Sequence, residues 1–308
     1  MKNAFVNALL QLAREDESIW LVTGDIGFGV LTPFWKQFPD RFVNAGIAEQ
    51  AMMSMAAGLA LEGKTAFVYS IANFLSLRCL EQIRNDCAYH GANVKVVNVG
   101  AGFAYGAMGM SHHGTEDAAA LRAIPGVTVI TPCDPLETAA AARAAADIPG
   151  TCYLRLGRGG EEILHQSPPA LRIGKALKLF DGGRVALFAA GAIASEAVKA
   201  RALLAEKGLC PAVYSVPFLK PMDAALIRQA AREYELIVTV EEHNILGGLG
   251  GAVAEIQAEL AGARARLLRI GLKDVFSSAV GGQRYLRGQY GLCARQITER
   301  IWEELKQQ

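Results

Sequence analysis

Short apolar runs rich in β-branched residues alternate with longer helical segments along the first half of the chain. Such a run, bounded by turn residues, is typical of a strand buried on both faces. The alternation of strands and helices predicts a mostly parallel sheet with helices on both faces. The expected strands are residues 19–23, 41–43, 65–69, 94–99, 127–130 and 152–156, and the expected helices are 48–62, 74–90, 115–123 and 136–147.

The composition changes at residues 157–160 and again at 167–169, where glycine, serine and proline predict a linker. Beyond the linker the alternation resumes. The length of 308 residues also favours about two domains of roughly 150 residues. We therefore expect two α/β domains, at 1–165 and 175–308. The second should contain strands at 185–190, 212–216, 236–241 and 265–270, and helices at 194–207, 223–233, 248–260 and 294–305.

Charge and cysteine content exclude several classes of protein. The chain has 31 Lys and Arg against 30 Asp and Glu, so nothing favours binding to nucleic acid or to an anionic membrane. Its six cysteines form no CxxC pair and lie mostly in apolar stretches, which indicates buried, reduced thiols and no metal site. No apolar run approaches the ~20 residues that span a bilayer, and the N-terminus is too polar for a signal peptide. A cytoplasmic protein is expected.

Glu49 is the first candidate for a site residue. A strand ends at 43, the chain turns at Gly46, and a nearly all-apolar helix follows, which indicates a buried helix. Glu49 would then lie at the carboxyl end of a sheet, where α/β proteins bind ligands. An alternative is structural: with Gly46 as N-cap, a glutamate at the third helical position would bind free backbone N–H groups.

A glycine-rich loop at 100–117 is the second candidate. It follows an expected strand, contains five glycines and is longer than an ordinary connection. His112 and His113 titrate near neutrality, which suits proton transfer, although either could instead cap the helix at 115–123. The loop has no Lys-Ser/Thr end like that of a P-loop, and its glycine spacing is a poor match to a dinucleotide fingerprint.

Phe74 begins a helix after a strand, where core packing is the default unless a flat heterocycle binds nearby.

Taken together, these segments resemble the transketolase and deoxyxylulose-phosphate synthase family from about Thr23 to the C-terminus. The resemblance implies the parallel-sheet pyrimidine-binding domain of thiamine-diphosphate enzymes, followed by a smaller α/β transketolase C-terminal domain. The motifs that carry it are Gly24-Asp25, residues 42–50, the Ser-His-His-Gly-Thr-Glu-Asp run at 111–117, residues 122–125 and 132–134, and the Glu-Glu-His-Asn segment at 241–244 with the glycines after it.

The resemblance also implies roles for individual residues. Glu49 matches the glutamate that hydrogen-bonds N1′ of the aminopyrimidine ring of thiamine diphosphate and shares its proton. Phe74 would stack on that ring, and Asp25 would lie near the cofactor. His112, together with His113, would face the substrate, and Arg158 matches an arginine that grips a sugar phosphate.

A Gly-Asp-Gly motif, with which family members bind the diphosphate and Mg²⁺, does not occur in the sequence. We therefore expect an N-terminal transketolase subunit, encoded separately, to hold the diphosphate and Mg²⁺, and each active site to lie between two chains of a heterotetramer. Leu77, Met108 and Gly100 stand where transketolases have a second stacking aromatic, an aspartate and a histidine that contact cofactor or substrate. We therefore expect ketol transfer as the reaction, but we make no prediction that the substrates are the ordinary pentose phosphates.

Three alternatives stay open at this point. The β subunit of a 2-oxo-acid dehydrogenase shares the layout and the glutamate, and a deoxyxylulose-phosphate-synthase-like enzyme shares many motifs. A third possibility is a structural or regulatory pairing subunit without catalysis. The presence of Glu49, Phe74 and His112 in the same chain argues against it. Residues 241–244 could be metal ligands, but packing at the domain interface is the favoured interpretation.

Overall fold

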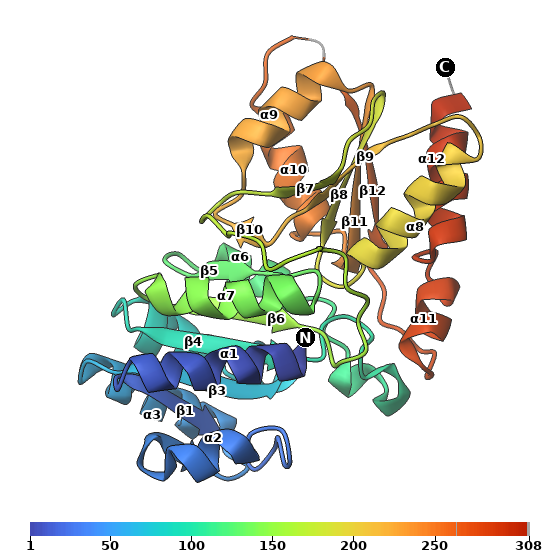
Figure 1. Cartoon of the computed structure of the whole chain (residues 1–308). Helices are drawn as coiled ribbons and strands as arrows, with labels where there is room; N and C mark the ends of the chain where they lie inside the picture. The colour runs from blue at the N-terminus through green and yellow to red at the C-terminus, as the bar shows by residue number, and fades with distance from the viewer. Residues whose placement is uncertain (263, 307–308) are drawn as a thin grey trace.

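The computed structural model describes residues 1–262 and 264–306, which form two α/β domains, one above the other (Figure 1). Each domain is built on its own sheet. The first has seven strands in the order β10-β5-β6-β4-β3-β1-β2, and the second has five in the order β12-β11-β8-β9-β7. The α/β architecture expected from the alternating pattern is therefore confirmed.

Six strands of the first sheet run parallel. They are β1 (Ile19–Thr23), β2 (Phe42–Asn44), β3 (Thr65–Ile71), β4 (Val94–Val99), β5 (Thr128–Ile130) and β6 (Cys152–Leu156). All residues of β4 and β6 are buried, as expected for strands covered on both faces. Because the strands are parallel, the loops that follow them meet at one edge of the sheet, and this edge carries most of the predicted site residues.

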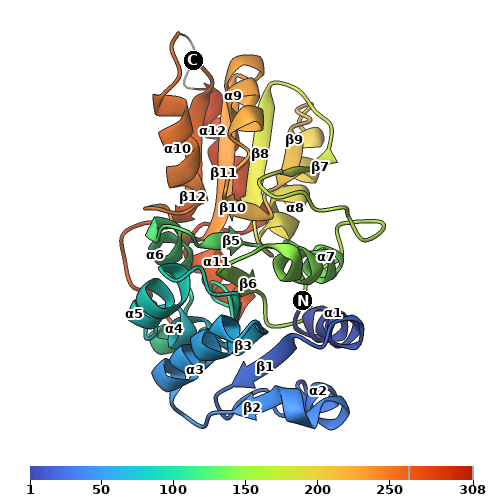
Figure 2. The same cartoon turned by 90° about the vertical axis from the view of Figure 1, so that its left-hand side faces the viewer.

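Helices cover both faces of the first sheet (Figure 2). On one face α1 (Lys2–Glu15) packs along α7 (Pro135–Asp147), with α2 (Thr32–Gln37) beyond them; on the other lie α3 (Glu49–Leu61), α4 (Ala72–Leu75), α5 (Leu80–Gln82) and α6 (Asp117–Ala123). Helices α1 and α2 were not predicted, although α1 buries a regular apolar stripe that includes Phe5 and Leu9.

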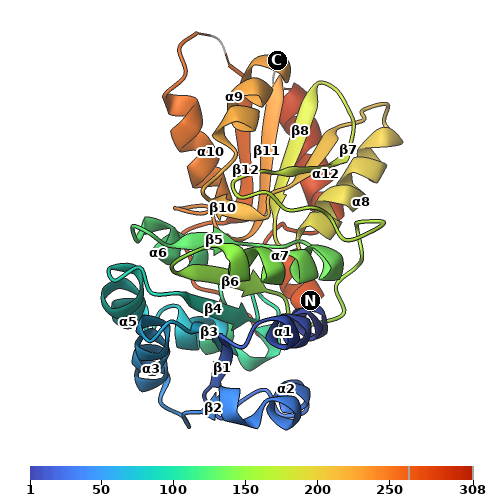
Figure 3. The same ribbon diagram turned by 60° about the vertical axis from the view of Figure 1, so that its left-hand side comes forward.

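The second sheet consists of β7 (Leu177–Phe180), β8 (Val185–Ala190), β9 (Ala212–Ser215), β11 (Leu236–Asn244) and β12 (Arg266–Leu272), and only β7 is antiparallel to its neighbour. Figure 3 shows α8 (Ala194–Ala205) and α12 (Ala294–Lys306) on one face, and α9 (Ala224–Glu233) and α10 (Leu249–Ala258) on the other. The short helix α11 (Gln283–Gln289) lies toward the first domain.

Two differences from the predicted elements bear on function. Strand β10 (Phe218–Lys220), from the second half of the chain, pairs antiparallel with β5 and extends the first sheet. The predicted helix at 74–90 was wrong as a single helix, because it is divided into α4, α5 and a π-helix at Ile83–Ala88. Between α4 and α5 the N–H of Arg78 donates to the carbonyl of Asn73 at 3.2 Å, a widened turn that redirects the chain.

Within the described ranges, no helix combines the length and the apolar character needed to cross a membrane.

Candidate active site

Most of the predicted site residues follow strand ends at the carboxyl edge of the first sheet. Asp25 comes after β1, Glu49 after β2, Phe74 after β3 and Arg158 after β6, while the histidine loop follows β4. The topology therefore brings together five segments that are far apart in sequence, at the edge where parallel α/β sheets bind ligands.

Glu49 is the first residue of α3 and is only 5% exposed. The turn before it needs a left-handed residue, which Gly46 provides with φ 71°. The N-cap of α3 is Ala48, so the alternative in which Gly46 caps the helix and Glu49 occupies the third position was wrong. Its carboxylate Oε2 instead accepts a hydrogen bond from Nη1 of Arg78 at 2.7 Å, in an ion pair. Oε1 has no hydrogen-bond partner among the described residues and remains free for a donor.

Arg78 connects Glu49 with the predicted aromatic residue. Its guanidinium carbon lies 4.7 Å from the centroid of the Phe74 ring, and that ring meets the His112 ring edge to face, with centroids 5.2 Å apart. The structure therefore places Glu49, Arg78, Phe74 and His112 in one continuous row. Sequence analysis missed Arg78, although a cation four residues after a candidate aromatic residue was a signal that could have found it.

Asp25 lies at the exposed end of β1 in a left-handed conformation, with φ 55°. Asn44, at the end of β2, holds it there: the Asp25 N–H donates to Asn44 Oδ1 at 2.8 Å, and Asn44 Nδ2 donates back to Asp25 Oδ1 at 3.3 Å. The same Asn44 oxygen accepts the N–H of Gly46 at 3.0 Å. Asn44 thus joins the loop of Asp25 to the turn that positions Glu49.

The two histidines of the glycine-rich loop have different environments. His112 is partly exposed beside Phe74, and its Nδ1 lies 3.0 Å from Ser111 Oγ. His113 is only 2% exposed, packs edge to face on Phe103 with centroids 5.1 Å apart, and burial lowers its pKa. Asn73 fixes the backbone just after the pair by donating to the carbonyl of His113 at 2.5 Å. Only His112 therefore lies with the row at the sheet edge.

Arg158 lies in the exposed segment after β6, and its guanidinium carbon is 5.3 Å from the centroid of the Tyr105 ring. Tyr105 belongs to the same glycine-rich loop as His112. Arg158 is thus close to the candidate site but, within the described part of the chain, makes no hydrogen bond to Glu49, Phe74 or His112.

The Glu-Glu-His-Asn segment at 241–244 forms the end of β11 at the junction of the two domains. Glu241 accepts the N–H groups of Leu249 and Gly250, while Glu242 accepts the Phe103 N–H at 2.7 Å and pairs with Arg287. His243 is fully enclosed, and burial lowers its pKa to about 4. These residues pack at the interface between the two domains, in agreement with the interpretation favoured from the sequence.

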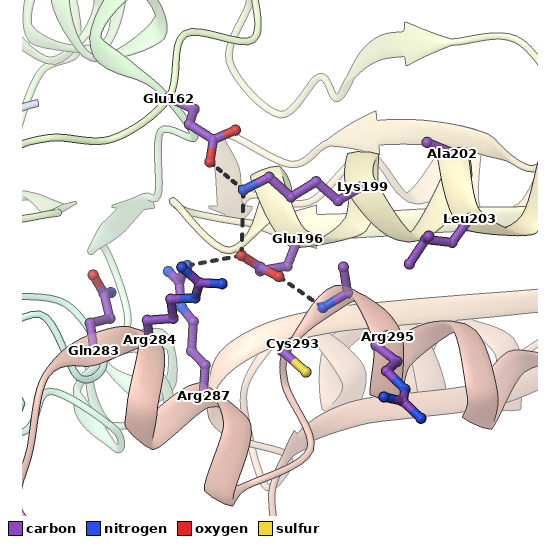
Figure 4. A pocket seen from close by; sticks show the side chains of 11 residues that line it. Glu162, Glu196, Lys199, Ala202, Leu203, Gln283, Arg284, Arg287, Cys293 and Arg295 are labelled. Carbon is purple, nitrogen blue, oxygen red and sulfur yellow. Dashed lines mark hydrogen bonds and ion pairs between the residues drawn. The ribbon is translucent and has the colours of Figure 1, made fainter.

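A groove in the second domain, between α8 and the segment from α11 to α12, contains none of the predicted site residues. Figure 4 shows Glu196 at the centre of a small network: it contacts Lys199, Arg287 and the backbone N–H of Ala294, and Lys199 also pairs with Glu162. This pairing is consistent with packing of α8 against α11 and α12.

The residues at the sheet edge fit one half of a thiamine cofactor. A buried carboxylate with one free oxygen can accept a hydrogen bond from a protonated ring nitrogen, and the partly exposed Phe74 ring beside it can stack on a flat heterocycle. Among the described residues, Cys133, Glu137 and His165 form a group of three potential metal ligands, and they lie away from this edge. The residues described at this edge thus fit the pyrimidine ring of the cofactor.

Comparison with known proteins defines the class of this protein. The transketolase pyrimidine-binding domain matches residues 1–160, and the transketolase C-terminal domain matches residues 174–297. The chain therefore belongs to the transketolase family, whose members depend on thiamine diphosphate, and it comprises the C-terminal half of such an enzyme.

Individual relatives are of the same kind. A putative transketolase C-terminal section of Methanocaldococcus jannaschii is 39% identical over 311 residues, covering 100% of this chain and 97% of the relative. One of the subunits of an apulose-4-phosphate transketolase from Phocaeicola vulgatus is 40% identical over 260 residues, covering 84% and 83%. A split-gene transketolase solved as an inactive β4 tetramer superimposes with a TM-score of 0.91 at 35% identity, covering 99% and 97%. Two of these relatives are thus described as parts of transketolases whose polypeptide is divided between subunits or genes.

Proposed function

We propose that this chain is the C-terminal subunit of a split transketolase that transfers a two-carbon ketol unit between sugar or sugar-phosphate substrates. In this proposal Glu49 and Phe74 bind the pyrimidine ring of thiamine diphosphate. An N-terminal transketolase subunit holds the diphosphate and Mg²⁺, and two copies of each chain form a heterotetramer. Bound thiamine diphosphate would supply the nucleophilic carbon that breaks and forms the carbon–carbon bond.

The observation that supports this most is the apolar rim around Glu49. We use the name apolar rim for the large exposed side chains Phe28, Ile47, Met55, Leu77, Met108 and Met110, which are between 41% and 81% exposed. A cleft beside Asp25 continues it with Ile26, Leu31, Trp35 and Phe42. Exposed apolar side chains on the loops and helices next to a buried carboxylate are typical of a protein interface that also completes a binding site. The occupant that fits is the subunit carrying the diphosphate site.

Glu49 has a defined task in this arrangement. Its free Oε1 can share a proton with the pyrimidine N1′ atom, and its ion pair with Arg78 fixes the direction of the carboxylate. Phe74 holds the ring plane, and Arg78 on the Phe74 face limits the side from which the ring can enter. The chain thus orients the ring and holds a proton at one atom of it.

Substrate binding is assigned to the partly exposed side of the same row. His112 can donate to, or accept from, a substrate hydroxyl, and Arg158 can bind an anionic end of the sugar. Apulose 4-phosphate, named for one relative, carries such a group. His113, although predicted with His112, is assigned a supporting role because it is enclosed against Phe103.

Cofactor binding by the separated and combined subunits tests the proposal. Thiamine diphosphate and Mg²⁺ are titrated into this chain, into the N-terminal subunit and into the mixture, and binding is followed by calorimetry and ketol transfer by product analysis. We expect tight binding and activity only in the mixture. Tight binding by this chain alone would contradict the split site, and decarboxylation of a 2-oxo acid in place of ketol transfer would favour the dehydrogenase alternative.

A further inference from the structure

A buried cluster of a thiol, a carboxylate and an imidazole lies where the two domains and their linker meet, away from the row of Glu49 and His112. Cys133 follows β5, Glu137 is in the first turn of α7, and His165 belongs to the linker. One ligand atom from each of the three lies within 4.8 Å of the other two. Cys133 is 1% exposed, Glu137 is fully buried, and the side chain of His165 is 11% exposed.

The distances between these atoms are close to those of a coordination shell. Glu137 Oε2 lies 2.9 Å from Cys133 Sγ and 3.5 Å from His165 Nε2. Ligands of a tetrahedral Zn²⁺ ion, bonded at 2.0–2.3 Å, are about 3.3–3.8 Å apart. An ion therefore needs the sulfur and oxygen to separate by less than about 1 Å. His165 Nε2 has no hydrogen-bond partner among the described residues and lies nearest to Glu137 Oε2, while Nδ1 of the same ring is 3.9 Å from Cys133 Sγ, so a small rotation of the ring is also needed.

The surroundings hold each ligand in the orientation that a metal requires. His165 Nδ1 lies 3.0 Å from Asp134 Oδ2, so a proton on Nδ1 is bound by a carboxylate and Nε2 is left with its lone pair. Asp134 is itself fixed by the N–H groups of Leu164 and His165. Ser215, at the end of β9, donates to Glu137 at 2.9 Å and 3.0 Å and fixes that carboxylate from the second domain.

We propose that Cys133, Glu137 and His165 form a structural zinc site that fastens the linker and the second domain to the first. Thiolate, imidazole and carboxylate are the ligand types that Zn²⁺ takes in proteins, and one water supplies the fourth position. The charges balance: an ion of charge +2 meets one thiolate, one carboxylate and a neutral imidazole. Binding releases the thiol proton to solvent, together with any proton on His165 Nε2.

The competing arrangement contains no metal. Burial alone would lower the pKa of His165, but the hydrogen bond with Asp134 and the charge of Glu137 raise it. In the arrangement without metal, a protonated His165 ring lies between the carboxylates of Asp134 and Glu137. In that case the thiol keeps its proton and donates to Glu137. The two arrangements differ in metal content and in the state of the Cys133 sulfur.

Metal analysis of the full chain distinguishes them. The chain, carrying no metal-binding tag, is stripped with a chelator, titrated with Zn²⁺ or Co²⁺, and examined by mass spectrometry for metal content and by absorption for the thiolate-to-cobalt charge-transfer band. We expect one ion per chain and a charge-transfer band. Cys133→Ser should abolish the band, and both Cys133→Ser and His165→Gln should weaken Zn²⁺ binding at least about 100-fold.

Two matched variants serve as controls, because Cys210 and His90 are exposed and distant from the cluster in sequence. Cys210→Ser and His90→Gln should leave metal binding unchanged. If Cys133→Ser fails to fold, the linker variant His165→Gln carries the test by itself. Absence of binding at micromolar free Zn²⁺ overturns the proposal, and so does equal affinity in His165→Gln or a band that persists in a folded Cys133→Ser chain.

Discussion

Buried carboxylates paired with arginines occur in two regions of this molecule, the domain junction and the carboxyl edge of the first sheet, and the two regions differ. At the domain junction, Asp117 pairs with Arg155 at 2.8 Å, both at most 4% exposed, and Glu241 is bound by two backbone N–H groups. At the carboxyl edge of the first sheet, the buried Glu49 has one partner, the half-exposed Arg78, and faces the apolar rim. Junction carboxylates are satisfied by the chain itself, whereas Glu49 keeps an oxygen available.

This difference separates structural charge from functional charge. A buried ion pair that is fully hydrogen-bonded within one chain fixes the domains relative to each other, and removing one partner is costly. A buried carboxylate with a free oxygen beside exposed apolar surface is incomplete until something binds there. The variants below test the contrast by removing one charge at a time.

The largest effect is expected on catalysis from Glu49→Gln. The amide keeps the shape but removes the negative charge that holds a proton at the pyrimidine ring, so kcat of the reconstituted enzyme should fall about 10²- to 10⁴-fold. Stability should change little, because the ion pair with Arg78 is half open to solvent. Steady-state ketol transfer and urea unfolding measure both quantities. Glu62→Gln, an exposed change just after the same helix, is the control, and equal kcat in the two variants would remove Glu49 from the mechanism.

The opposite result is expected for Asp117→Asn at the junction. The buried Arg155 would lose its ionic partner while still donating to the carbonyls of Gly114 and Glu242, so the free energy of unfolding should fall by about 3–5 kcal/mol. Urea denaturation measures the loss, with the exposed Asp147→Asn as a control. A loss below about 1 kcal/mol would mean that the junction charges contribute no more than surface pairs do.

The two neighbouring histidines repeat the contrast on a smaller scale. His112→Ala should lower kcat/KM about 10- to 100-fold through loss of one substrate hydrogen bond, with little effect on stability. His113→Ala should lower the free energy of unfolding by about 1–3 kcal/mol, because the ring packed on Phe103 is lost, and should change kcat/KM less. Paired kinetic and unfolding measurements decide between them. An exchange of these two outcomes would show that His113 contacts the substrate.

Much of this fold could be predicted from hydrophobic periodicity. The strands at 19–23, 94–99, 152–156 and 185–190 occur with the predicted bounds, because long buried runs carry a strong signal. Periodicity could not predict β10, which has three residues and depends on pairing with β5 in the other domain. The break of the helix at 74–90 was also hidden, since the widened turn occurs at Arg78, whose ion pair with Glu49 is a tertiary contact.

The candidate site was predictable where a residue follows a strand and matches a family motif, as Glu49, Phe74 and His112 do. Partners contributed by other elements were not. Arg78 lies in an irregular segment, and the difference between His112 and His113 arises from Phe103, which turns one ring inward. Adjacent identical residues give identical local signals, so only the packed structure distinguishes them.

The smallest expected effect is a change in pH dependence at the junction. Burial raises the pKa of Glu241 from 4.5 to about 7 and lowers that of His243 from 6.5 to about 4. Between pH 4.5 and 6.5 the folded state thus holds a proton on Glu241 that the unfolded state has lost, and lacks the proton that unfolded His243 carries. The two groups therefore change the free energy of unfolding with pH in opposite directions. Their combined contribution to stability should depend little on pH between 4.5 and 6.5.

Single substitutions should expose each slope. Subtracting the stability of Glu241→Gln from that of the unaltered chain should give a difference that falls by about 1.4 kcal/mol per pH unit as the pH rises from 4.5 to 6.5. The corresponding difference for His243→Gln should rise by a similar amount per unit over the same range. Urea unfolding at half-unit steps of pH measures both. The slope is the relevant quantity, because each variant also loses hydrogen bonds that lower stability equally at every pH. Parallel profiles for all three proteins would show that these groups keep their ordinary pKa values and that the junction admits water.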